Sequence, residues 1–380
     1  MRVAFIPSTF LPYIGGAEIQ THNLANKLVE NGLNIDVLLL DKVSIKNSKY
    51  KIIKLNKALM SFVFIFKYYF SLNFGFLLRI YFRKLIKEKN YNVWHFHSVN
   101  YKTLIYINEL KKLNQKIVVT LQGADIQIDS EIKYGYRLDK KYDDYLKISF
   151  QNVDQFHAIS SSIISDLQKL KIDSKKIYKI PNCTHINKIE KFKNFNKENK
   201  LILLTIGRYA VKKKGFDLIE NVASHLKKIV NFKWIIIGRD TQNLLSNNFV
   251  KNNLDNFEII EQIENFDEVY FPHSKLINYY KMSNVYVNLA RIEGCPIVVL
   301  DALASRIPII TFDTKGGDEL VIDGINGFII KDFNYELFAK KISYFKEFKI
   351  DSNNERLLKH LRKYDLEENT KKIIKLYEII

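Results

Sequence analysis

The chain has 380 residues, of which 47% are hydrophobic, a composition that excludes an intrinsically disordered protein and suffices for about two domains. The two cysteines, Cys183 and Cys295, fit neither a metal-binding spacing nor a disulfide framework, which is typical of a reducing compartment. The formal net charge of +18 arises mainly in residues 1–190 and favours phosphorylated ligands, anionic lipid or nucleic acid as partners. A general bias of the chain toward Lys, Asn, Ile, Tyr and Phe explains the total charge equally well.

In the first half of the chain, apolar strand-like segments alternate with stretches of helical periodicity. The N-terminus reads as a buried strand and not as a signal peptide. A loop with Gly15 and Gly16 follows, and then a helix that ends near Gly32. This alternation predicts a parallel, doubly wound sheet. Its strands are expected at 3–7, 35–40, 93–96, 117–121 and 155–159.

The second half repeats this plan, so we expect an α/β protein with two Rossmann-like domains. Ligands of such sheets bind at the carboxyl ends of the strands, and two sheets that face each other would form a cleft between the domains. The predicted strands are 201–206, 234–238, 257–260, 285–289 and 309–312. The predicted divisions are a first domain at 1–182, a linker at 183–200, a second domain at 201–363, and a C-terminal helix at 364–380 that crosses back to the first domain.

Residues 57–89 form an aromatic, largely apolar segment whose basic residues gather at its C-terminal end. A membrane-spanning helix needs about 20 predominantly apolar residues, but Lys67 and Gly75 interrupt this segment. Helices that lie in the membrane interface, with aromatic and basic side chains at the level of the headgroups, fit the pattern better. The segment therefore predicts contact with an anionic membrane surface. Helices that only pack on the sheet, or one spanning helix, are the alternatives.

The most informative short segment is the one from Glu293 to Asp301. Its two carboxylates stand eight positions apart across a strand end, a Gly-Cys-Pro turn and a helix start. Pro296 suits the first helical position, where its missing N–H costs nothing. Such a turn exposes the free N–H groups of a helix N-terminus, which favour anions. The spacing alone fits an ordinary strand, turn and helix with charged edges equally well.

An ordered set of motifs over nearly the whole chain resembles glycosyltransferase family 4, which comprises retaining enzymes of the GT-B fold. Each motif is weak alone, and the specificity lies in their order. In chain order they are Pro12 to Glu18, His95-Phe96-His97, Thr120 to Asp125, His157 to Ser160, Ile180-Pro181-Asn182, Gly207-Arg208 with Lys214-Gly215, Glu293 to Asp301, Gly316-Gly317, and Asp323 to Gly327.

In the second domain, the resemblance implies a nucleotide-sugar site. Glu293 would contact the donor sugar and support an oxocarbenium-like charge, and Asp301 would bind the ribose hydroxyls. Arg208, with Lys213 or Lys214, would neutralise the diphosphate in place of a divalent ion, since the chain has no Asp-x-Asp. The turn would hold the phosphate through backbone N–H groups. It comprises Gly294, Cys295, Pro296 and Ile297.

In the first domain, the resemblance implies residues that face the reaction. Gly15 and Gly16 would let the backbone approach the diphosphate at a helix N-terminus. His97 would face the transferred sugar and, as a base, would have a pKa suited to neutral pH. A core histidine with satisfied hydrogen bonds is the alternative for His97, and the core is favoured for His95. Asp125 is a candidate for contact with the acceptor.

The chain departs from the family pattern at four places. Asp301 stands where Glu is usual and is one methylene shorter, and Gln122 stands where His is common. One extra residue separates Arg208 from Lys214, so either neighbouring lysine can be the phosphate lysine. The segment after Gly316 is slightly shorter than usual.

The sequence thus predicts a retaining, metal-independent glycosyltransferase that needs no cofactor. It would move a sugar from a nucleotide-diphosphate donor, with UDP favoured, to a hydroxyl of a lipid-linked precursor of a cell-surface glycan such as lipopolysaccharide. The expected location is cytoplasmic and peripheral, on the inner face of the cell membrane, with no nucleic acid as a partner. The alternatives are a nucleotide-sugar hydrolase or epimerase of the same fold, and a non-catalytic protein that binds anionic membrane or nucleic acid.

Overall fold

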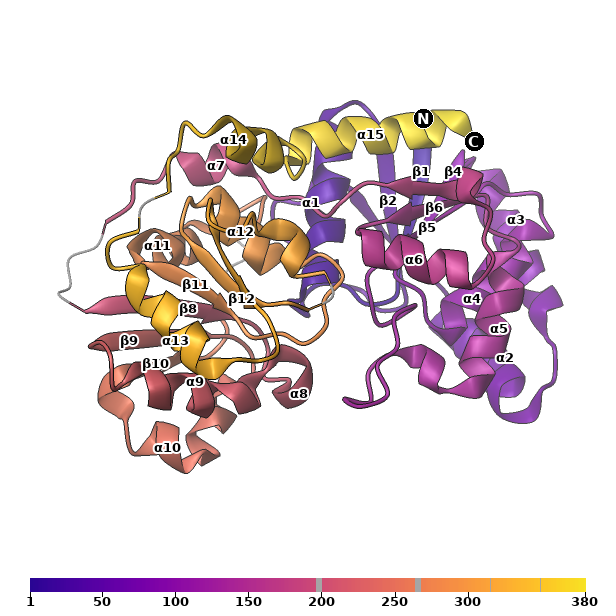
Figure 1. Ribbon diagram of the computed structural model, residues 1–380. Helices are drawn as coiled ribbons and strands as arrows, with labels where there is room; N and C mark the ends of the chain where they lie inside the picture. The colour runs from indigo at the N-terminus through magenta and orange to yellow at the C-terminus, as the bar shows by residue number, and fades with distance from the viewer. Residues whose placement is uncertain (196–199, 264–267, 315, 349) are drawn as a thin grey trace. The chain divides into compact units, whose positions relative to one another are not determined.

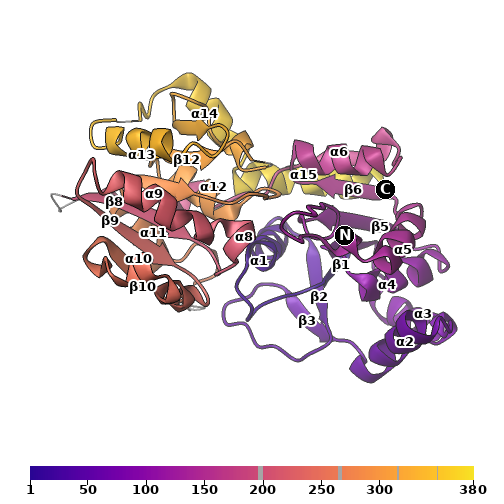
Figure 2. The same ribbon diagram turned by 60° about the horizontal axis from the view of Figure 1, so that its bottom comes forward.

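The computed structural model describes residues 1–380 except 196–199, 264–267, 315 and 349. The chain forms two compact units, and each unit is built on one parallel sheet (Figures 1 and 2). The first unit contains Met1–Pro181 and Asn369–Ile380, and the second contains Asn182–Glu368. The predicted α/β fold with two Rossmann-like sheets is confirmed.

The first sheet has the order β3-β2-β1-β4-β5-β6-β7, and every pair of neighbours is parallel. The direction in which strands are added reverses between β1 and β4. Since crossovers are right-handed, this reversal places the helices after these two strands on opposite faces. The strands are β1 (Arg2–Pro7), β2 (Asn34–Leu39), β3 (Lys51–Lys54), β4 (Val93–His97), β5 (Ile117–Leu121), β6 (Gln155–Ala158) and β7 (Ile177–Lys179).

The helices of the first unit begin at side-chain caps in several cases. The side chain of Asn56 caps α2, and Asn100 forms a reciprocal capping box with Thr103 at α4. The last helix, drawn in yellow in Figure 1, begins in the second unit and continues into the first. The helices are α1 (Gly16–Glu30), α2 (Lys57–Phe70), α3 (Gly75–Lys89), α4 (Tyr101–Lys111), α5 (Lys140–Phe150), α6 (Ser161–Lys169) and α15 (Leu366–Ile379).

The aromatic segment 57–89 forms the two helices α2 and α3, and each has a buried side and an exposed side. Of the helices in the described part of the chain, none has the length and apolar content that crossing a bilayer requires. The buried side chains are Met60, Val63, Leu78, Phe82 and Leu85. The exposed large hydrophobic side chains are Phe62, Ile65, Tyr69, Phe70, Leu72, Phe76 and Ile80, defined here as the apolar face of α2 and α3.

The second sheet has the order β10-β9-β8-β11-β12-β13 and is also parallel throughout, with its reversal between β8 and β11. Its core contains the fully buried Trp234 and Phe312, which lie on strands from both sides of that reversal. The strands are β8 (Leu201–Ile206), β9 (Phe232–Ile237), β10 (Phe257–Ile260), β11 (Val285–Asn288), β12 (Ile309–Phe312) and β13 (Gly327–Ile330).

The predicted linker 183–200 contains a short helix of the second unit, and its residues 196–199 lie outside the described part of the chain. This helix, α7, lies against α12. The helices of the second unit are α7 (Ile186–Glu190), α8 (Val211–Lys214), α9 (Ile219–Leu226), α10 (Asn248–Lys251), α11 (Ser274–Met282), α12 (Ile297–Ala304), α13 (Tyr335–Tyr344) and α14 (Glu355–Arg362).

Candidate active site

The predicted donor residues of the second unit gather where its strand order reverses. Arg208 follows β8, and Glu293 follows β11, the strand that pairs with β8 on the other side of the reversal. The carboxyl ends of strands at such a reversal are the usual binding edge of an open α/β sheet, because the crossover helices diverge there. The fold therefore places both halves of the predicted site at one edge of one sheet.

Two lysines of α8 hold the carboxylate of Glu293. Lys214 Nζ lies 2.5 Å from Glu293 Oε1, and Lys213 Nζ lies 4.0 Å from Glu293 Oε2. The three side chains are largely buried: that of Glu293 is 9% exposed, and those of the two lysines about 20%. Both lysines that the sequence left as alternatives thus face Glu293, and Lys214 makes the direct contact.

Burial and charge oppose each other at this cluster. Burial acts to raise the pKa of Glu293, but the charges of Lys214, Lys213 and Arg208 together hold that pKa below its ordinary value. Burial lowers the pKa of Lys213 to about 8, although the attraction of Glu293 acts to raise it. Arg208 is exposed, so its guanidinium contributes a positive field at the open side of the cluster. Glu293 is consequently ionised near neutral pH.

An ion pair that the sequence analysis did not single out fixes α8 next to Glu293. Arg291 forms two hydrogen bonds of 2.7 and 2.9 Å with the carboxylate of Asp217, and it also donates to the carbonyl of Lys212. The backbone N–H of Arg291 donates to the carbonyl of Lys213. The only hint in the sequence was the position of Arg291 two residues before Glu293, because nothing local reveals a partner 74 residues away.

Two glycines with positive φ allow the backbone to close around the cluster. A Cβ atom on Gly215 (φ +70°) would lie 2.0 Å from the carbonyl oxygen of Leu289, just after β11. A Cβ atom on Gly316 (φ +83°) would lie 2.0 Å from the carbonyl oxygen of Glu293 itself. Any larger residue at these positions would clash with backbone. Gly316 thus lies directly against the backbone of Glu293.

The Gly-Cys-Pro turn leads into α12 as expected, with one correction. Pro296 is the N-cap of α12 and not its first residue, so the helix begins at Ile297. Its φ of −72° still suits the turn. The Asn182 side chain donates to the carbonyl of Cys295 at 3.0 Å and anchors the turn to the start of the second unit. Gly294 and Cys295 are buried.

Asp301 lies inside α12 and faces the interior of its unit. Its Oδ1 accepts a hydrogen bond of 2.6 Å from Thr184 Oγ1, and the residue is 3% exposed. Burial raises the pKa of Asp301 to about 7, against the lowering effect of the Thr184 hydroxyl. Thr184 was not predicted as part of this site, because residues 183–200 were assigned to a linker. In the structure, the carboxylate of Asp301 thus contacts a side chain of its own unit. Binding of the ribose hydroxyls by Asp301 stays a prediction.

In the first unit, Gly15 and Gly16 lie at the N-terminus of α1, after the loop that follows β1. Gly15 is the N-cap in an extended conformation, and α1 begins at Gly16. The carboxylate of Glu18 folds back over this turn, where a Cβ atom on Gly15 would meet it at 2.5 Å, and Thr9 donates a hydrogen bond to it. A side chain of the helix itself thus occupies the space next to Gly15.

His97 ends β4, the strand that pairs with β1 at the reversal of the first sheet. Its ring lies 4.0 Å from that of His95 and 4.2 Å from that of Phe5, measured between centroids. Within the described part of the chain, its buried Nε2 has no hydrogen-bond partner. The expectation of a pKa suited to neutral pH is wrong, because burial, followed by the charge of His157, lowers the pKa of His97 well below 6.5.

His95 belongs to a buried chain of hydrogen bonds, as the sequence favoured. His157 Nε2 contacts the carbonyl of Ile180 at 2.6 Å and must donate, so His157 Nδ1 accepts from Thr120 Oγ1 at 2.7 Å. Thr120 then accepts from His95 Nε2 at 2.7 Å, and His95 Nδ1 accepts from the hydroxyl of Tyr377 at 2.6 Å. This order assigns one neutral tautomer to each histidine and ties α15 to the sheet.

Asp125 is fully buried, and its carboxylate forms hydrogen bonds with the backbone of the loops after β4 and β5. It accepts hydrogen bonds from the backbone N–H groups of Gln122, Gly123 and Val99 at 2.9 to 3.3 Å. Such an arrangement fixes the two loops relative to each other. The role of Asp125 in contact with an acceptor stays a prediction, and these contacts give it no support.

Two family descriptions match the chain in succession. "Glycosyltransferase Family 4" matches residues 14–188, and "Glycosyl transferases group 1" matches residues 187–370. Together with the paired Rossmann-like sheets, these matches show that the chain belongs to the glycosyltransferases of the family 4 type, which have the GT-B fold. The resemblance drawn from the motifs is thereby confirmed.

Relatives and solved structures agree with this assignment. An uncharacterised glycosyltransferase of Methanocaldococcus jannaschii is 25% identical over 98% of this chain and 97% of its own length. The capsular polysaccharide biosynthesis glycosyltransferase CapM of Staphylococcus aureus is 28% identical over 41% of this chain and 39% of its own length. The HepE protein of Anabaena, solved in complex with UDP-glucose, shares the fold with a TM-score of 0.71, 12% identity and complete coverage of both chains.

Proposed function

We propose that this glycosyltransferase is a retaining, metal-independent enzyme that transfers a sugar from a UDP-sugar to a hydroxyl of a lipid-linked precursor of a cell-surface glycan. The observation that carries the proposal is the cluster of Lys213, Lys214 and Glu293 at the binding edge of the second sheet. HepE, solved with UDP-glucose, supports UDP as the donor nucleotide, and CapM supports a polymer of the cell surface.

The lysine cluster offers the charge that departure of a nucleoside diphosphate requires. Two ammonium groups lie within 4.0 Å of the Glu293 carboxylate, and Arg208 adds its charge from the exposed side. A bound diphosphate would compete with Glu293 for these cations, so donor binding would free the carboxylate. The ionised Glu293 would then stabilise positive charge at the anomeric carbon while the lysines stabilise the leaving group. The N–H groups at the start of α12 would add to phosphate binding.

The first unit would serve the acceptor at the inner face of the membrane. Its apolar face of α2 and α3 stands beside the lysines and arginines of the same helices, a combination typical of interfacial binding. We expect the protein to co-sediment with anionic liposomes at low salt and to be released as the salt concentration rises. No binding at low salt would refute the membrane part of the proposal and would leave the transfer chemistry intact.

UDP release tests the chemistry. Wild-type protein should release UDP from a UDP-sugar only when a glycan acceptor is present, and Glu293→Gln should lower that rate by roughly 10²–10³-fold, the usual cost of a lost electrostatic group in a site. The matched control is Glu336→Gln, which changes an exposed glutamate at the start of α13. Release without an acceptor would identify a hydrolase. Equal rates for Glu293→Gln and wild type would refute the assignment of Glu293.

A further inference from the structure

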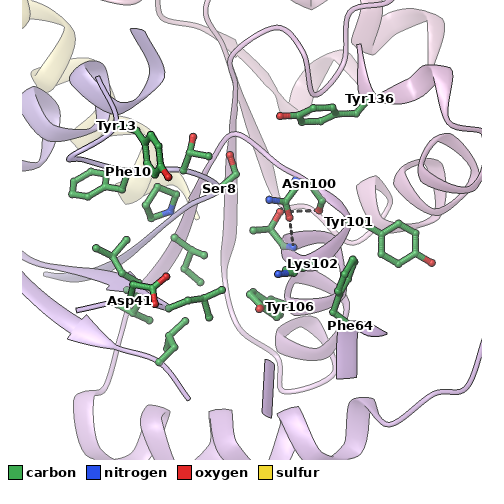
Figure 3. Close-up of a pocket in the computed structure, with 18 of the residues that line it drawn as sticks. Ser8, Phe10, Tyr13, Asp41, Phe64, Asn100, Tyr101, Lys102, Tyr106 and Tyr136 are labelled. Carbon is green, nitrogen blue, oxygen red and sulfur yellow. Dashed lines mark hydrogen bonds between the residues drawn. The ribbon is translucent and has the colours of Figure 1, made fainter. Parts of the chain in front are cut away.

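The first unit contains a cavity of about 810 Å³ at the carboxyl edge of its sheet (Figure 3). Its walls come from the segments after β1 and β2, the C-terminal half of α2, the first turns of α4 and residues 135–142. In Figure 3, Phe10 and Tyr13 line one side, while Lys102 and Tyr106 of α4 line the other. The residues predicted for donor and sugar are not among its lining residues.

Most of the polar side chains in the lining are engaged with other protein groups. Asp41 pairs with Lys57 at 2.7 Å, and Asn100 and Thr103 satisfy each other in the capping box of α4. Asp139 accepts from the hydroxyl of Tyr68 at 2.7 Å. The remaining lining is dominated by aliphatic and aromatic side chains, among them Phe10, Leu38, Leu39, Leu55, Phe64 and Tyr69. A saccharide, with many hydroxyls, would find few partners here, whereas a hydrocarbon needs none.

Two polar groups of the lining have no polar protein partner among the described residues. The residue Tyr106 is only 3% exposed, and its buried hydroxyl has no hydrogen-bond partner there. The Lys102 ammonium group contacts an aromatic ring: its Nζ lies 4.9 Å from the ring centroid of Phe64. The two residues are four positions apart on α4 and therefore share one face of that helix. They form a small polar patch in the wall of the cavity.

The cavity continues into the apolar face of α2 and α3. Tyr69 belongs to both, since it lines the cavity and is 67% exposed. Phe70, the next residue of the same face, is 62% exposed. A hydrocarbon chain that enters past Tyr69 would therefore stay in contact with apolar side chains along its way.

We propose that this cavity binds the hydrocarbon chain of an amphiphilic phosphate ester, with Lys102 and the Tyr106 hydroxyl at its anionic head. This inference rests on the proposed function, because such an amphiphile would be the lipid portion of the acceptor. It adds a site and a ligand chemistry: one apolar chain that ends in a phosphate or diphosphate, from an isoprenoid or from a single-chain phospholipid.

The test is direct binding to the purified full chain, without a donor, by calorimetry. Farnesyl diphosphate should bind saturably, while inorganic diphosphate and farnesol should each bind more weakly because each lacks one half of the ligand. Val43→Trp should fill the cavity from the half-buried loop after β2 and weaken binding by at least about tenfold. Lys102→Ala should weaken it by about fivefold, and the matched control Lys116→Ala, at an exposed position before β5, should leave it unchanged.

The outcomes separate this inference from the proposed function. Failure of farnesyl diphosphate to bind, or binding that Val43→Trp leaves intact, would overturn the inference. If UDP-sugar turnover on a soluble glycan nevertheless depends on Glu293, the proposed function stands without it. Equal binding of lysophosphatidate would support the site and show that it accepts either source of chain. Since Val43→Trp changes packing, its circular dichroism must match wild type, and Lys102→Ala provides the independent variant.

Discussion

Lys214 Nζ lies 2.5 Å from Glu293 Oε1, and this ion pair joins α8, the helix that follows β8, to the carboxylate that follows the neighbouring strand β11. The contact is mostly shielded from water, and the charge of Lys214 helps to hold the pKa of Glu293 below its ordinary value. In the structure, the lysines that we propose for diphosphate binding are thus held by the carboxylate of Glu293. If they bind the donor as proposed, donor binding would exchange one anion for another.

Removal of the Lys214 charge should weaken the binding of the nucleotide UDP. Lys214→Met keeps the aliphatic stem, and we expect the dissociation constant for UDP to rise by about 10- to 100-fold, since a hydrogen bond to a charged group contributes about 1.5–3 kcal/mol. Lys212→Met is the matched control, because Lys212 belongs to the same short helix but pairs with Asp217 at 3.0 Å. Calorimetric titration with UDP measures the dissociation constants of wild type and of the two variants. Equal weakening by both variants would mean that only the overall charge of α8 matters.

Donor affinity should depend on pH through Lys213. Because burial lowers its pKa to about 8, the ammonium group is protonated below that pH and is lost progressively above it. UDP affinity should therefore fall between about pH 7.5 and 9.5. The variant Lys213→Arg stays charged over this range, so it should flatten the profile. A profile for Lys213→Arg as steep as that of wild type would assign the effect to another group.

Asp301 should make the second unit less stable as the pH rises. Its folded pKa of about 7 lies above the ordinary value of about 3.9 for an unfolded chain, so the native state binds the extra proton. The free energy of unfolding should fall as the pH rises from about 4 to 7 and stay low above it. The loss should be a few kcal/mol, at about 1.4 kcal/mol for each unit of pKa difference.

Urea titrations of wild type and Asp301→Asn at pH 5 and pH 8 measure this effect. The neutral Asn keeps the size and an oxygen acceptor for Thr184, so the variant should gain stability relative to wild type at pH 8 and little at pH 5. The difference between the two proteins removes the contribution of other titrating groups. A difference that is constant with pH would contradict the raised pKa.

The hydroxyl of Tyr377 should stabilise the first unit through His95. Tyr377→Phe keeps the ring and leaves His95 Nδ1 without its 2.6 Å donor in a fully buried position. An unsatisfied buried group costs about 1–3 kcal/mol, so the midpoint of urea unfolding should fall accordingly. Tyr344→Phe, at a residue that is 51% exposed, is the control and should change little. Unfolding midpoints that match for both variants would show that the chain of hydrogen bonds adds no stability.

The sequence was sufficient for the fold and for bringing Lys213, Lys214 and Glu293 into one predicted cluster, because strand patterns and motif order are local. Their role in donor binding stays a prediction. Apolar runs that end in glycine identified strands such as β8, and the motif order identified the family. Three strands were not predicted: β3, β7 and β13. The first two are short edge strands with partly exposed residues, so they lack the continuous apolar run of a buried strand.

Contacts between distant residues could not be read from the sequence. The pairing of Arg291 with Asp217, and that of Thr184 with Asp301, depend on how loops meet after the sheet has formed. The lowered pKa of His97 has the same origin, since burial and not the motif determines it. The composition of 57–89 did suggest helices that lie in the membrane interface or pack on the sheet, but it could not indicate that α2 forms one wall of a cavity.

The return of Asn369–Ile380 to the first unit has a consequence for the order of synthesis. Until Tyr377 has left the ribosome, His95 Nδ1 has no hydrogen-bond donor, and the first unit lacks part of its core although its own sheet was translated long before. The second unit, in contrast, has all of its residues by then. Loss of the last residues of the chain should accordingly destabilise the unit that is synthesised first.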